Sequence, residues 1–281
     1  MTTMTDNAGN AADQIRFGFG NNWLQFIKTL DDRQIAEAEM SLRKLLGRKN
    51  LNNMTFLDIG SGSGLFSLVA RQLGARVHSF DYDADSVTST KTLRERYFPN
   101  DDSWTVEQGS ILDASYVARL GTFDVVYSWG VLHHTGALQR AIENATTKIA
   151  SGGLMCLALY CKTPLCWAWR IEKRIYSLSP RPIQGFLESM YVWGMKMVFF
   201  IRGGDFNAFV HDYSRSRGME FMTNVRDWVG GYPYESISES ETLAIAARLG
   251  LEPVQRFCQS PSFGFLGSHC DEYVFRKPTG P

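Results

Sequence analysis

The sequence lacks three things that would narrow its function at once: an excess of charge of one sign, a cysteine signature and an export signal. Its 281 residues carry 29 Lys and Arg against 29 Asp and Glu, so a nucleic-acid partner is disfavoured. Five cysteines, an odd number without a C-x-x-C pair, indicate neither a metal site nor a disulfide framework. The N-terminal "MTTMTDNAGN" has no charged region followed by an apolar one. These absences predict a protein of the reducing cytoplasm.

The sequence also lacks an apolar run long enough to span a membrane. The longest run, residues 186–201, is interrupted by Glu188 and Lys196 and falls short of the roughly 20 residues that a spanning helix needs. With 44% apolar and 21% charged residues, the chain can still bury a large core, as one domain or as one domain with a cap.

What the sequence does contain is an alternation of short apolar strands with helical patterns. This alternation predicts an α/β fold with a mostly parallel sheet of seven strands, covered by helices on both faces and closed by an antiparallel last strand. Within it, helices are expected over residues 64–73, 84–96 and 137–149, with a short one near residue 115.

The same patterns divide the chain into five parts. They are residues 1–14, expected to be disordered; 15–50, an N-terminal helical arm; 51–160, the main ligand-binding core; 161–236, an inserted helical cap; and 237–281, a helix and an antiparallel strand pair that complete the core. Ligands of such a sheet bind at the carboxyl ends of its parallel strands.

The stretch "LDIGSGSG" ends the first predicted strand in glycines at positions 60, 62 and 64. Glycine lets the backbone turn tightly and lets a ligand lie against it, and the helix that follows points its N-terminus at that ligand. A dinucleotide-binding turn, G-x-G-x-x-G, would need a small residue where this chain has Leu65. The turn is therefore built for a different ligand.

Two acidic residues near this turn indicate the chemical character of the ligand. Asp58 would repel a pyrophosphate but suit an amine or a sulfonium, unless it only accepts hydrogen bonds from the amides of its own loop. Asp81, at the end of the second predicted strand, is placed to accept hydrogen bonds from both hydroxyls of a ribose. The predicted ligand has a ribose and a cationic end, and no phosphate.

Four segments resemble the class I S-adenosylmethionine-dependent methyltransferases, in the small-molecule branch that includes the ubiquinone-biosynthesis type O-methyltransferases. "LDIGSGSG" matches the glycine loop, "FDYD" the ribose-binding acid, "VEQGSILD" the adenine loop, and "FDVVYSWGVLHHT" the fourth strand with the loop after it. Their order is that of the family. The resemblance implies a Rossmann-like core, S-adenosylmethionine as the cofactor and methyl transfer as the activity.

The resemblance also assigns cofactor contacts to residues at the ends of the first four strands. These are Asp58, Gly60, Ser61, Gly62, Asp81, Tyr82, Ser110, Ile111, Ser128 and Trp129. Glycines 60 and 62 would border the methionine part and Asp81 would bind the ribose. Tyr82 would pack on the adenine, or would serve packing alone. Ser128 and Trp129 would lie near the sulfonium.

A histidine pair follows the fourth strand. Methyl transfer from a sulfonium depends mainly on alignment, but a hydroxyl acceptor must lose its proton, and imidazole titrates near physiological pH. His133 and His134 are therefore the candidate catalytic residues. The resemblance favours His134 as the base, and the alternative is that the pair only braces its loop.

The acceptor site is expected beneath the cap. Tyr160 ends the fifth strand, and Tyr232 and Tyr234 lie in "RDWVGGYPYE", a rigid aromatic turn in which Trp228 is more typical of packing. These three tyrosines are the predicted substrate-binding residues.

The two flanking segments carry further expectations. The arm segment "FGFGNNW" is expected either to fold over the cofactor, with Asn22 and Trp23 reaching in, or to act as an apolar plug. In the cap, a stripe rich in Met and aromatic residues is more typical of a core. Arginines and lysines beside it would suit a long apolar acceptor or contact with a membrane surface.

The sequence as a whole favours an S-adenosylmethionine-dependent methyltransferase that acts on a small-molecule or lipid-like acceptor, on oxygen. Two alternatives stay open: a regulatory or interaction protein that binds the cofactor without turnover, and a nicotinamide-dependent oxidoreductase. Leu65 and Asp58 speak against the oxidoreductase.

Overall fold

The computed structural model describes residues 16–217, 221–260 and 262–279, so the expected disorder of residues 1–14 lies outside the described residues. Within them, seven strands form one sheet in the order β3-β2-β1-β4-β5-β7-β6. The strands are β1 (Thr55–Ile59), β2 (Arg76–Asp81), β3 (Trp104–Gln108), β4 (Phe123–Trp129), β5 (Ile149–Tyr160), β6 (Glu252–Phe257) and β7 (Cys270–Arg276). Neighbours from β3 to β5 pair in parallel, whereas β7 lies antiparallel between β5 and β6. The predicted sheet is confirmed.

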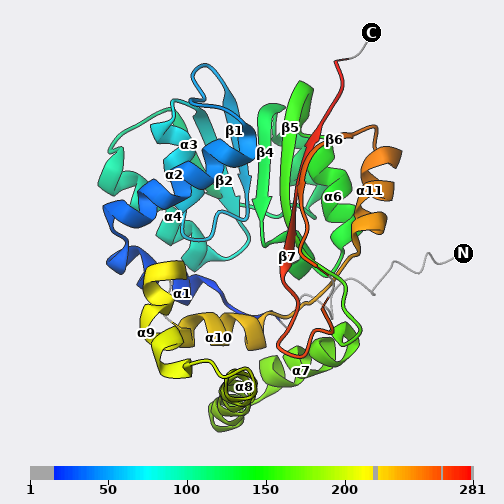
Figure 1. Ribbon diagram of the computed structural model, residues 1–281. Coiled ribbons are helices and arrows are strands. Elements are labelled where there is room, and N and C mark those ends of the chain that lie inside the picture. The colour runs from blue at the N-terminus through cyan, green and yellow to red at the C-terminus, as the bar shows by residue number, and fades with distance from the viewer. Residues whose placement is uncertain (1–15, 218–220, 261, 280–281) are drawn as a thin grey trace, which may run out of the picture.

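Helices cover both faces of this sheet (Figure 1). One face carries α2 (Asp32–Leu46), α3 (Leu65–Gln72) and α4 (Ala84–Tyr97); the other carries α5 (Ala114–Arg119), α6 (Leu138–Thr146) and α11 (Glu239–Arg248). Successive strand residues point to opposite faces, so Phe56 belongs to the first core and Leu57 to the second. Because both faces are covered, the strands are almost continuously apolar.

Local sequence determines where the helices begin. Asp31 accepts a hydrogen bond from the amide of Gln34, whose side chain accepts one from the amide of Asp31, and this capping box begins α2. Asp83 begins α4 by accepting from the amides of Asp85 and Ser86. This second cap also places the first turn of α4 beside the end of β2, where a ligand is expected.

One predicted boundary differs from the structure. The helical pattern extends over residues 137–149, but α6 ends at Thr146 and β5 begins at Ile149. Ile149 pairs with Phe123 ahead of a register shift. Gly152 and Gly153 interrupt the apolar pattern at this point, so the first residues of β5 do not resemble a strand in the sequence.

Four helices follow β5 and form the cap. They are α7 (Cys166–Leu178), α8 (Arg181–Ile201), α9 (Phe206–Arg217) and α10 (Phe221–Gly230). The cap lies at the end of the sheet where the parallel strands end (Figure 1). It has a small core of its own around Tyr213, Phe221 and Val225. Among the described helices, none combines the length and the apolar character that crossing a membrane requires.

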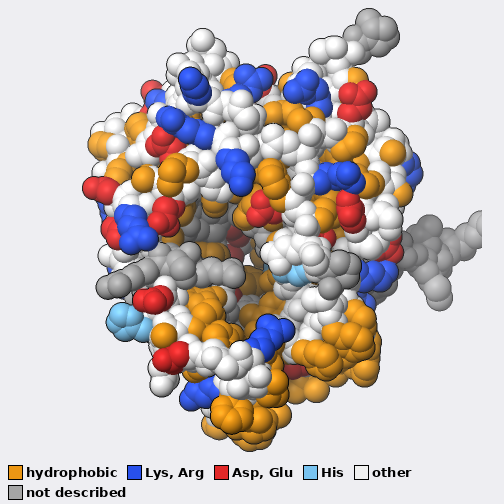
Figure 2. All heavy atoms as spheres, viewed as in Figure 1, with side chains coloured by type: hydrophobic (Ala, Val, Ile, Leu, Met, Phe, Trp, Pro, Cys, Tyr) orange, Lys and Arg blue, Asp and Glu red, His pale blue; other side chains and the backbone are white. Residues whose placement is uncertain are grey.

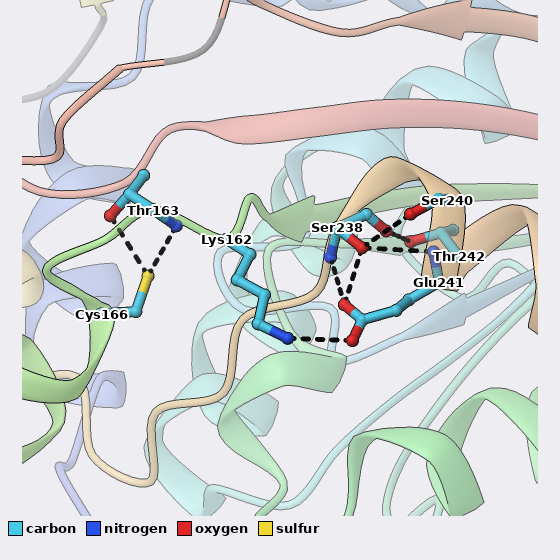
Figure 3. A network of polar contacts seen from close by, with 7 residues as sticks. All are labelled: Lys162, Thr163, Cys166, Ser238, Ser240, Glu241 and Thr242. Carbon is cyan, nitrogen blue, oxygen red and sulfur yellow. Dashed lines mark hydrogen bonds and ion pairs between the residues drawn. The ribbon is translucent and has the colours of Figure 1, made fainter.

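The two ends of the cap are joined at the edge of the sheet. Cys161 and Ile237 form a parallel bridge, and the amide of Lys162 donates to the carbonyl of Ile237. The Lys162 ammonium lies 2.9 Å from Glu241 Oε1, and Glu241 forms the capping box of α11 with Ser238 (Figure 3). The chain therefore leaves the sheet and returns to it at one place, which fixes the position of the cap above the strand ends.

Candidate active site

A cavity of about 1280 Å³ lies between the carboxyl ends of β1, β2 and β4 and the cap. The space-filling view is hollowed at this position (Figure 2). The turn after β1, the end of β2, the loops after β3 and β4, cap helices α8 to α10 and the arm around α1 (Gly20–Thr29) contribute to its walls. This is the edge of a parallel sheet at which ligands bind.

The turn after β1 presents bare backbone to the cavity. Gly60 has a φ of 76° and Gly62 a φ of 55°, in the left-handed region that favours glycine. A Cβ on Gly60 would lie 2.3 Å from Val131 Cγ1, and one on Gly62 would lie 3.1 Å from Trp23 Nε1. The amides of Gly60 and Ser61 donate to the carbonyl of Phe80, which holds the turn against β2. Side chains at either glycine would fill the space beside the turn.

Asp81 is fixed by backbone amides at both oxygens. Oδ2 accepts from the amide of Gly62 and Oδ1 from the amide of Asp83, each at 2.9 Å. Burial raises the pKa of Asp81 to about 6, although these amides oppose the shift. At neutral pH the group is a carboxylate whose remaining lone pairs can accept hydrogen bonds from a ligand.

Asp58 also lines the cavity but is only 2% exposed. Its Oδ2 accepts a hydrogen bond of 2.5 Å from the hydroxyl of Ser67, which belongs to α3 and not to the loop of Asp58. Burial raises its pKa to about 7, and the charge of Asp81 adds to the shift. A cationic group in the cavity would favour the ionised form of Asp58.

Tyr82, Ser110 and Ile111 line the side of the cavity where an adenine is expected. The Ser110 hydroxyl accepts from the amide of Leu112, and the carbonyl of Ile111 accepts from Asn144 Nδ2 at 2.7 Å. These bonds fix the loop after β3 at this wall of the cavity.

Arg16 is a residue that sequence reasoning missed. Its guanidinium lies 4.6 Å from the centroid of the Tyr82 ring and donates to the carbonyl of Thr135 at 3.0 Å. It therefore connects the end of β2 to the loop after β4, across the expected adenine position.

The structure separates the two predicted residues at the end of β4. Trp129 lines the cavity, with its ring stacked on Tyr127 at 5.4 Å. Ser128 is fully buried and does not line the cavity, because its hydroxyl donates to the carbonyl of Ile59 inside the sheet. The expectation that both lie near a sulfonium has geometric support for Trp129 only.

The structure separates the histidine pair in the same way. His134 lines the cavity, whereas His133 is fully buried beneath it and accepts a hydrogen bond from the amide of Tyr160 at its Nδ1. Burial holds the pKa of His133 well below its usual range. His133 is therefore out of reach of an acceptor, contrary to its expected catalytic role, and supports the loop.

His134 has a defined tautomer. Its Nδ1 lies 2.8 Å from the carbonyl of Pro233, and because a carbonyl can only accept, Nδ1 carries the proton and Nε2 carries the lone pair. Burial lowers the pKa of His134 to about 4, although backbone hydrogen bonds at Pro233 and Gly231 oppose the shift. The ring is neutral at physiological pH, and its Nε2 lies on the side of Gly231.

The three predicted acceptor tyrosines also differ. Tyr160 and Tyr232 line the cavity. Tyr234 is 2% exposed and does not line it, because its hydroxyl is shared with Ser268 at 2.8 Å and with the thiol of Cys166 at 3.3 Å. Trp228, for which packing was favoured, lines the cavity and also packs edge-on against Tyr160.

A buried lysine lies behind Trp228. The Lys173 ammonium is fully buried, lies 3.7 Å from the centroid of the Trp228 ring and makes no hydrogen bond within the described residues. Burial lowers the pKa of Lys173 to about 7, and the neighbouring Glu172 opposes the shift. Its charge contributes to the low pKa values of both histidines.

The arm reaches both ends of the cavity. Trp23 lies against Gly62, the amide of Phe17 donates to the carbonyl of Tyr232 at 3.0 Å, and Phe19 lies 5.1 Å from the His134 ring. Asn22 does not reach into the cavity: its side-chain amide donates to the carboxylate of Asp227 in α10. The arm therefore covers the cofactor side and fastens it to the cap.

Two features of the site come from residues that are far apart in the sequence. The far wall of the cavity is mainly apolar and is built by the cap residues Tyr191, Met195, Phe209, Tyr213, Phe221 and Val225, with Asn224 and Asp227 of α10 as polar members of the lining. Cys161, His269 and Asp271 bring a thiol, an imidazole and a carboxylate within 4.8 Å of one another at the end of β5 and the start of β7. In this cluster the imidazole pairs with the carboxylate at 3.3 Å. Neither feature has a local sequence motif.

Comparison with known proteins defines the class. Residues 32–189, more than half of the chain, match the family model described as "Methyltransferase domain", and the chain belongs to this family. A solved structure of magnesium protoporphyrin IX methyltransferase from Synechocystis PCC 6803 has the same fold, with a TM-score of 0.56 at 14% identity. The superposition covers 95% of this chain and 97% of that one. The family and the fold expected from the sequence are confirmed.

Curated relatives give a more specific likeness. The chain is 26% identical over 159 residues to the ubiquinone biosynthesis O-methyltransferase of Paramagnetospirillum magneticum and 29% identical over 146 residues to that of a Methylobacterium species. The matches cover 57% and 50% of this chain. They cover 58% and 54% of the relatives, so the chain spans little more than half the length of either.

Proposed function

We propose that the protein transfers a methyl group from S-adenosylmethionine to an oxygen atom of a small, lipid-like acceptor. One observation carries the proposal: a single cavity joins the glycine turn and Asp81 to His134, Tyr160 and the apolar wall of the cap. The cavity therefore has a polar end that fits a nucleoside and an apolar end that extends beyond the space a nucleoside would fill. At about 1280 Å³ it exceeds the size usual for one ligand, roughly 300 to 1,000 Å³.

The polar end fits the proposed cofactor. Asp81 accepts hydrogen bonds from the ribose hydroxyls, and Gly60 and Gly62 leave room for the methionine part because they carry no side chain. Tyr82 offers a ring for the adenine, and Asp58 offers a carboxylate to the cationic end. The fold is shared with a magnesium protoporphyrin IX methyltransferase whose structures contain S-adenosylmethionine or S-adenosylhomocysteine, which supports the choice.

The other end fits an acceptor with an apolar part. The side chains on this wall are mainly aromatic or aliphatic, and they surround space that continues from Tyr160 and Trp228 towards α8 and α9. Such surfaces favour flat or long apolar molecules over free sugars and amino acids. The named activity of the two curated relatives, an O-methyltransferase of ubiquinone biosynthesis, is of the same kind.

His134 supplies the base. A bound cofactor presents an activated methyl group on a sulfonium, with a neutral thioether as the leaving group. As the acceptor oxygen forms its bond to the methyl carbon, its O–H bond breaks and the proton passes to Nε2 of His134. Because the pKa of His134 is about 4, the imidazole cannot deprotonate a hydroxyl in advance, and proton transfer accompanies methyl transfer. Tyr160, Trp228 and Tyr232 hold the acceptor in line with the methyl group, and this alignment supplies the rest of the rate enhancement.

The test is product formation. The purified protein is incubated with S-adenosylmethionine and a panel of hydroxylated aromatic and isoprenoid acceptors, and both S-adenosylhomocysteine and the methylated acceptor are measured by mass spectrometry. Methylation on oxygen that depends on Asp81 and His134 supports the proposal. Tight cofactor binding without turnover of any acceptor would favour the regulatory alternative, and methylation on nitrogen or carbon would refute the choice of oxygen.

A further inference from the structure

The outer side of the cap carries a continuous apolar surface. We define the outer cap face as the exposed large apolar residues of α7 and α8. They are Trp167, Ile171, Ile175, Leu178, Ile183, Phe186, Met190, Trp193, Met197, Phe200 and Ile201, which are between 39% and 79% exposed. In the space-filling view, hydrophobic side chains gather at this end of the molecule (Figure 2). Exposed area on the order of 1,000 Å² follows from the size of such side chains, well above the largest patch of a typical monomer, roughly 300 to 600 Å².

The spacing of these residues shows that they form one face. On α7 they recur at intervals of four, four and three residues, and on α8 at intervals of three and four up to Phe200. The two helices are held together by Gln184, whose side chain donates to the carbonyl of Tyr176, and by the Tyr176 hydroxyl on buried Glu188. The outer cap face is therefore a broad surface on two adjacent helices.

Helix α8 is apolar on two sides. Its inner side contributes Tyr191 and Met195 to the wall of the cavity, and its outer side contributes six of the exposed residues above and the terminal Ile201. A helix that is apolar around most of its circumference is normally buried on all sides. The inner side of α8 is covered by the protein, so its outer side is left for a partner.

The charges around this face are mainly positive. Within residues 161–204, all of which are described, Arg170, Arg174, Arg181, Lys196 and Arg202 are exposed and no Asp or Glu is, while the exposed Lys162 pairs with Glu241 at the edge of the sheet. The next residue, Asp205, is an exposed acid. The two acids of the segment are turned inwards: Glu188 is buried, and Glu172 is half-buried beside Lys173. An apolar face with five exposed cations and one exposed acid near it complements an apolar surface that carries anions.

We propose that the outer cap face docks onto an anionic lipid bilayer, with α7 and α8 lying in the plane of the interface. Tryptophan, phenylalanine and basic side chains on one surface are the composition of helices that bind at this depth. A second copy of the chain fits less well, because a symmetric pair would bring ten cations of the two copies together with only the two Asp205 side chains to offset them. Docking would also bring the apolar wall of the cavity, which α8 shares, next to the bilayer from which the lipid-like acceptor proposed above would enter.

Vesicle flotation tests this proposal without cofactor or acceptor, so its result is independent of the proposed function. Vesicles of phosphatidylcholine alone are compared with vesicles in which about a third of the lipid is phosphatidylglycerol. We expect the protein to float with the anionic vesicles and to be released by high salt. The double variant Phe186→Ser with Trp193→Ser should bind at least tenfold more weakly, because two large apolar side chains no longer enter the interface.

Two further variants complete the design. Arg174→Gln with Arg202→Gln should lose the preference for anionic vesicles, while Met40→Ser, which removes an exposed apolar side chain from α2, should bind as the wild type does. Melting temperature and S-adenosylhomocysteine affinity, measured for each variant, show that the fold is intact. Equal binding of the wild type and the double variant would overturn the proposal. So would a wild-type dimer that ignores vesicles and that Phe186→Ser with Trp193→Ser separates into monomers.

Discussion

Replacing Asp81 by Ala should weaken cofactor binding without unfolding the protein. The carboxylate has two oxygens, each of which accepts a hydrogen bond of 2.9 Å from a backbone amide, and a carboxylate can accept further bonds from a ligand. Hydrogen bonds to a charged acceptor contribute about 1.5 to 3 kcal/mol when one partner is removed. We therefore expect the dissociation constant of S-adenosylhomocysteine to rise about 10- to 150-fold.

The pH dependence of the same interaction gives a second measurement. Because the pKa of Asp81 is raised to about 6, the free protein binds a proton there below pH 6, and the ligand must displace it. Asp58, with a pKa of about 7, adds a second step, because a cationic ligand favours its ionised form. Affinity should therefore fall as the pH drops through 7 and again through 6, and each group contributes up to about tenfold per pH unit. The Asp81→Asn variant, which keeps the shape of the side chain, should lose the step near pH 6 and keep the step near pH 7.

These dissociation constants are measured by isothermal titration calorimetry, with Asp102→Ala as the control variant. Asp102 is exposed and does not line the cavity, so its removal changes the net charge equally and should leave the affinity unchanged. If Asp81→Ala bound S-adenosylhomocysteine as tightly as the wild type, the ribose would not lie at the end of β2. If the wild type bound NAD with comparable affinity, the choice of cofactor would be refuted as well.

Three other predictions concern the acceptor side. His134→Ala should lower kcat about a hundredfold with little change in cofactor affinity. Because the pKa of His134 is about 4, this residue should add no step to the wild-type kcat/KM profile between about pH 6 and 8, and a step near pH 6.5 that His134→Ala abolishes would contradict the assignment. Tyr232→Ala should raise the acceptor KM. Tyr234→Phe should leave this KM unchanged and should lower the free energy of unfolding, measured by denaturant titration, by about 0.5 to 1.5 kcal/mol. The opposite result for the two variants would mean that Tyr234 and not Tyr232 contacts the acceptor. Lys173→Met should keep or raise the melting temperature, because an ammonium without a hydrogen bond is replaced by an apolar side chain of similar volume. A large drop in the melting temperature would contradict this and would show that the Lys173 charge stabilises the fold.

The parts of the site that the sequence predicted are those encoded by neighbouring residues. Alternating strands and helices gave the sheet, and the carboxyl ends of parallel strands meet at one edge, so Asp81, the glycine turn and the loop at Ser110 could be brought together without a structure. Trp129 and His134 follow from the same rule because Trp129 ends β4 and His134 lies in the loop that follows it.

The parts that could not be predicted depend on distant residues. The resemblance favoured His134 over His133, but the physical reason for the difference is non-local: it lies in the short turn at Leu132–His134 and in partners at Tyr160 and Pro233, far along the chain. Tyr234 turns away from the cavity because Ser268 and Cys166 bind its hydroxyl. The outer cap face could not be predicted either, because a stripe of Met and aromatic residues in a sequence is typical of a core. Only the packing of α8 shows which of these residues are covered by the protein and which are exposed.

The N-terminal arm contacts both ends of the cavity. Trp23 lies beside the cofactor turn, Phe17 is bonded to Tyr232 on the acceptor side, and Asn22 is bonded to Asp227 of the cap. A displacement of the arm would therefore alter the cofactor side and the acceptor side of the cavity together. Any coupling that such a displacement produced would be reciprocal, so that each ligand would change the affinity of the other by the same factor. The arm is thus the physical connection between the two ends of the cavity.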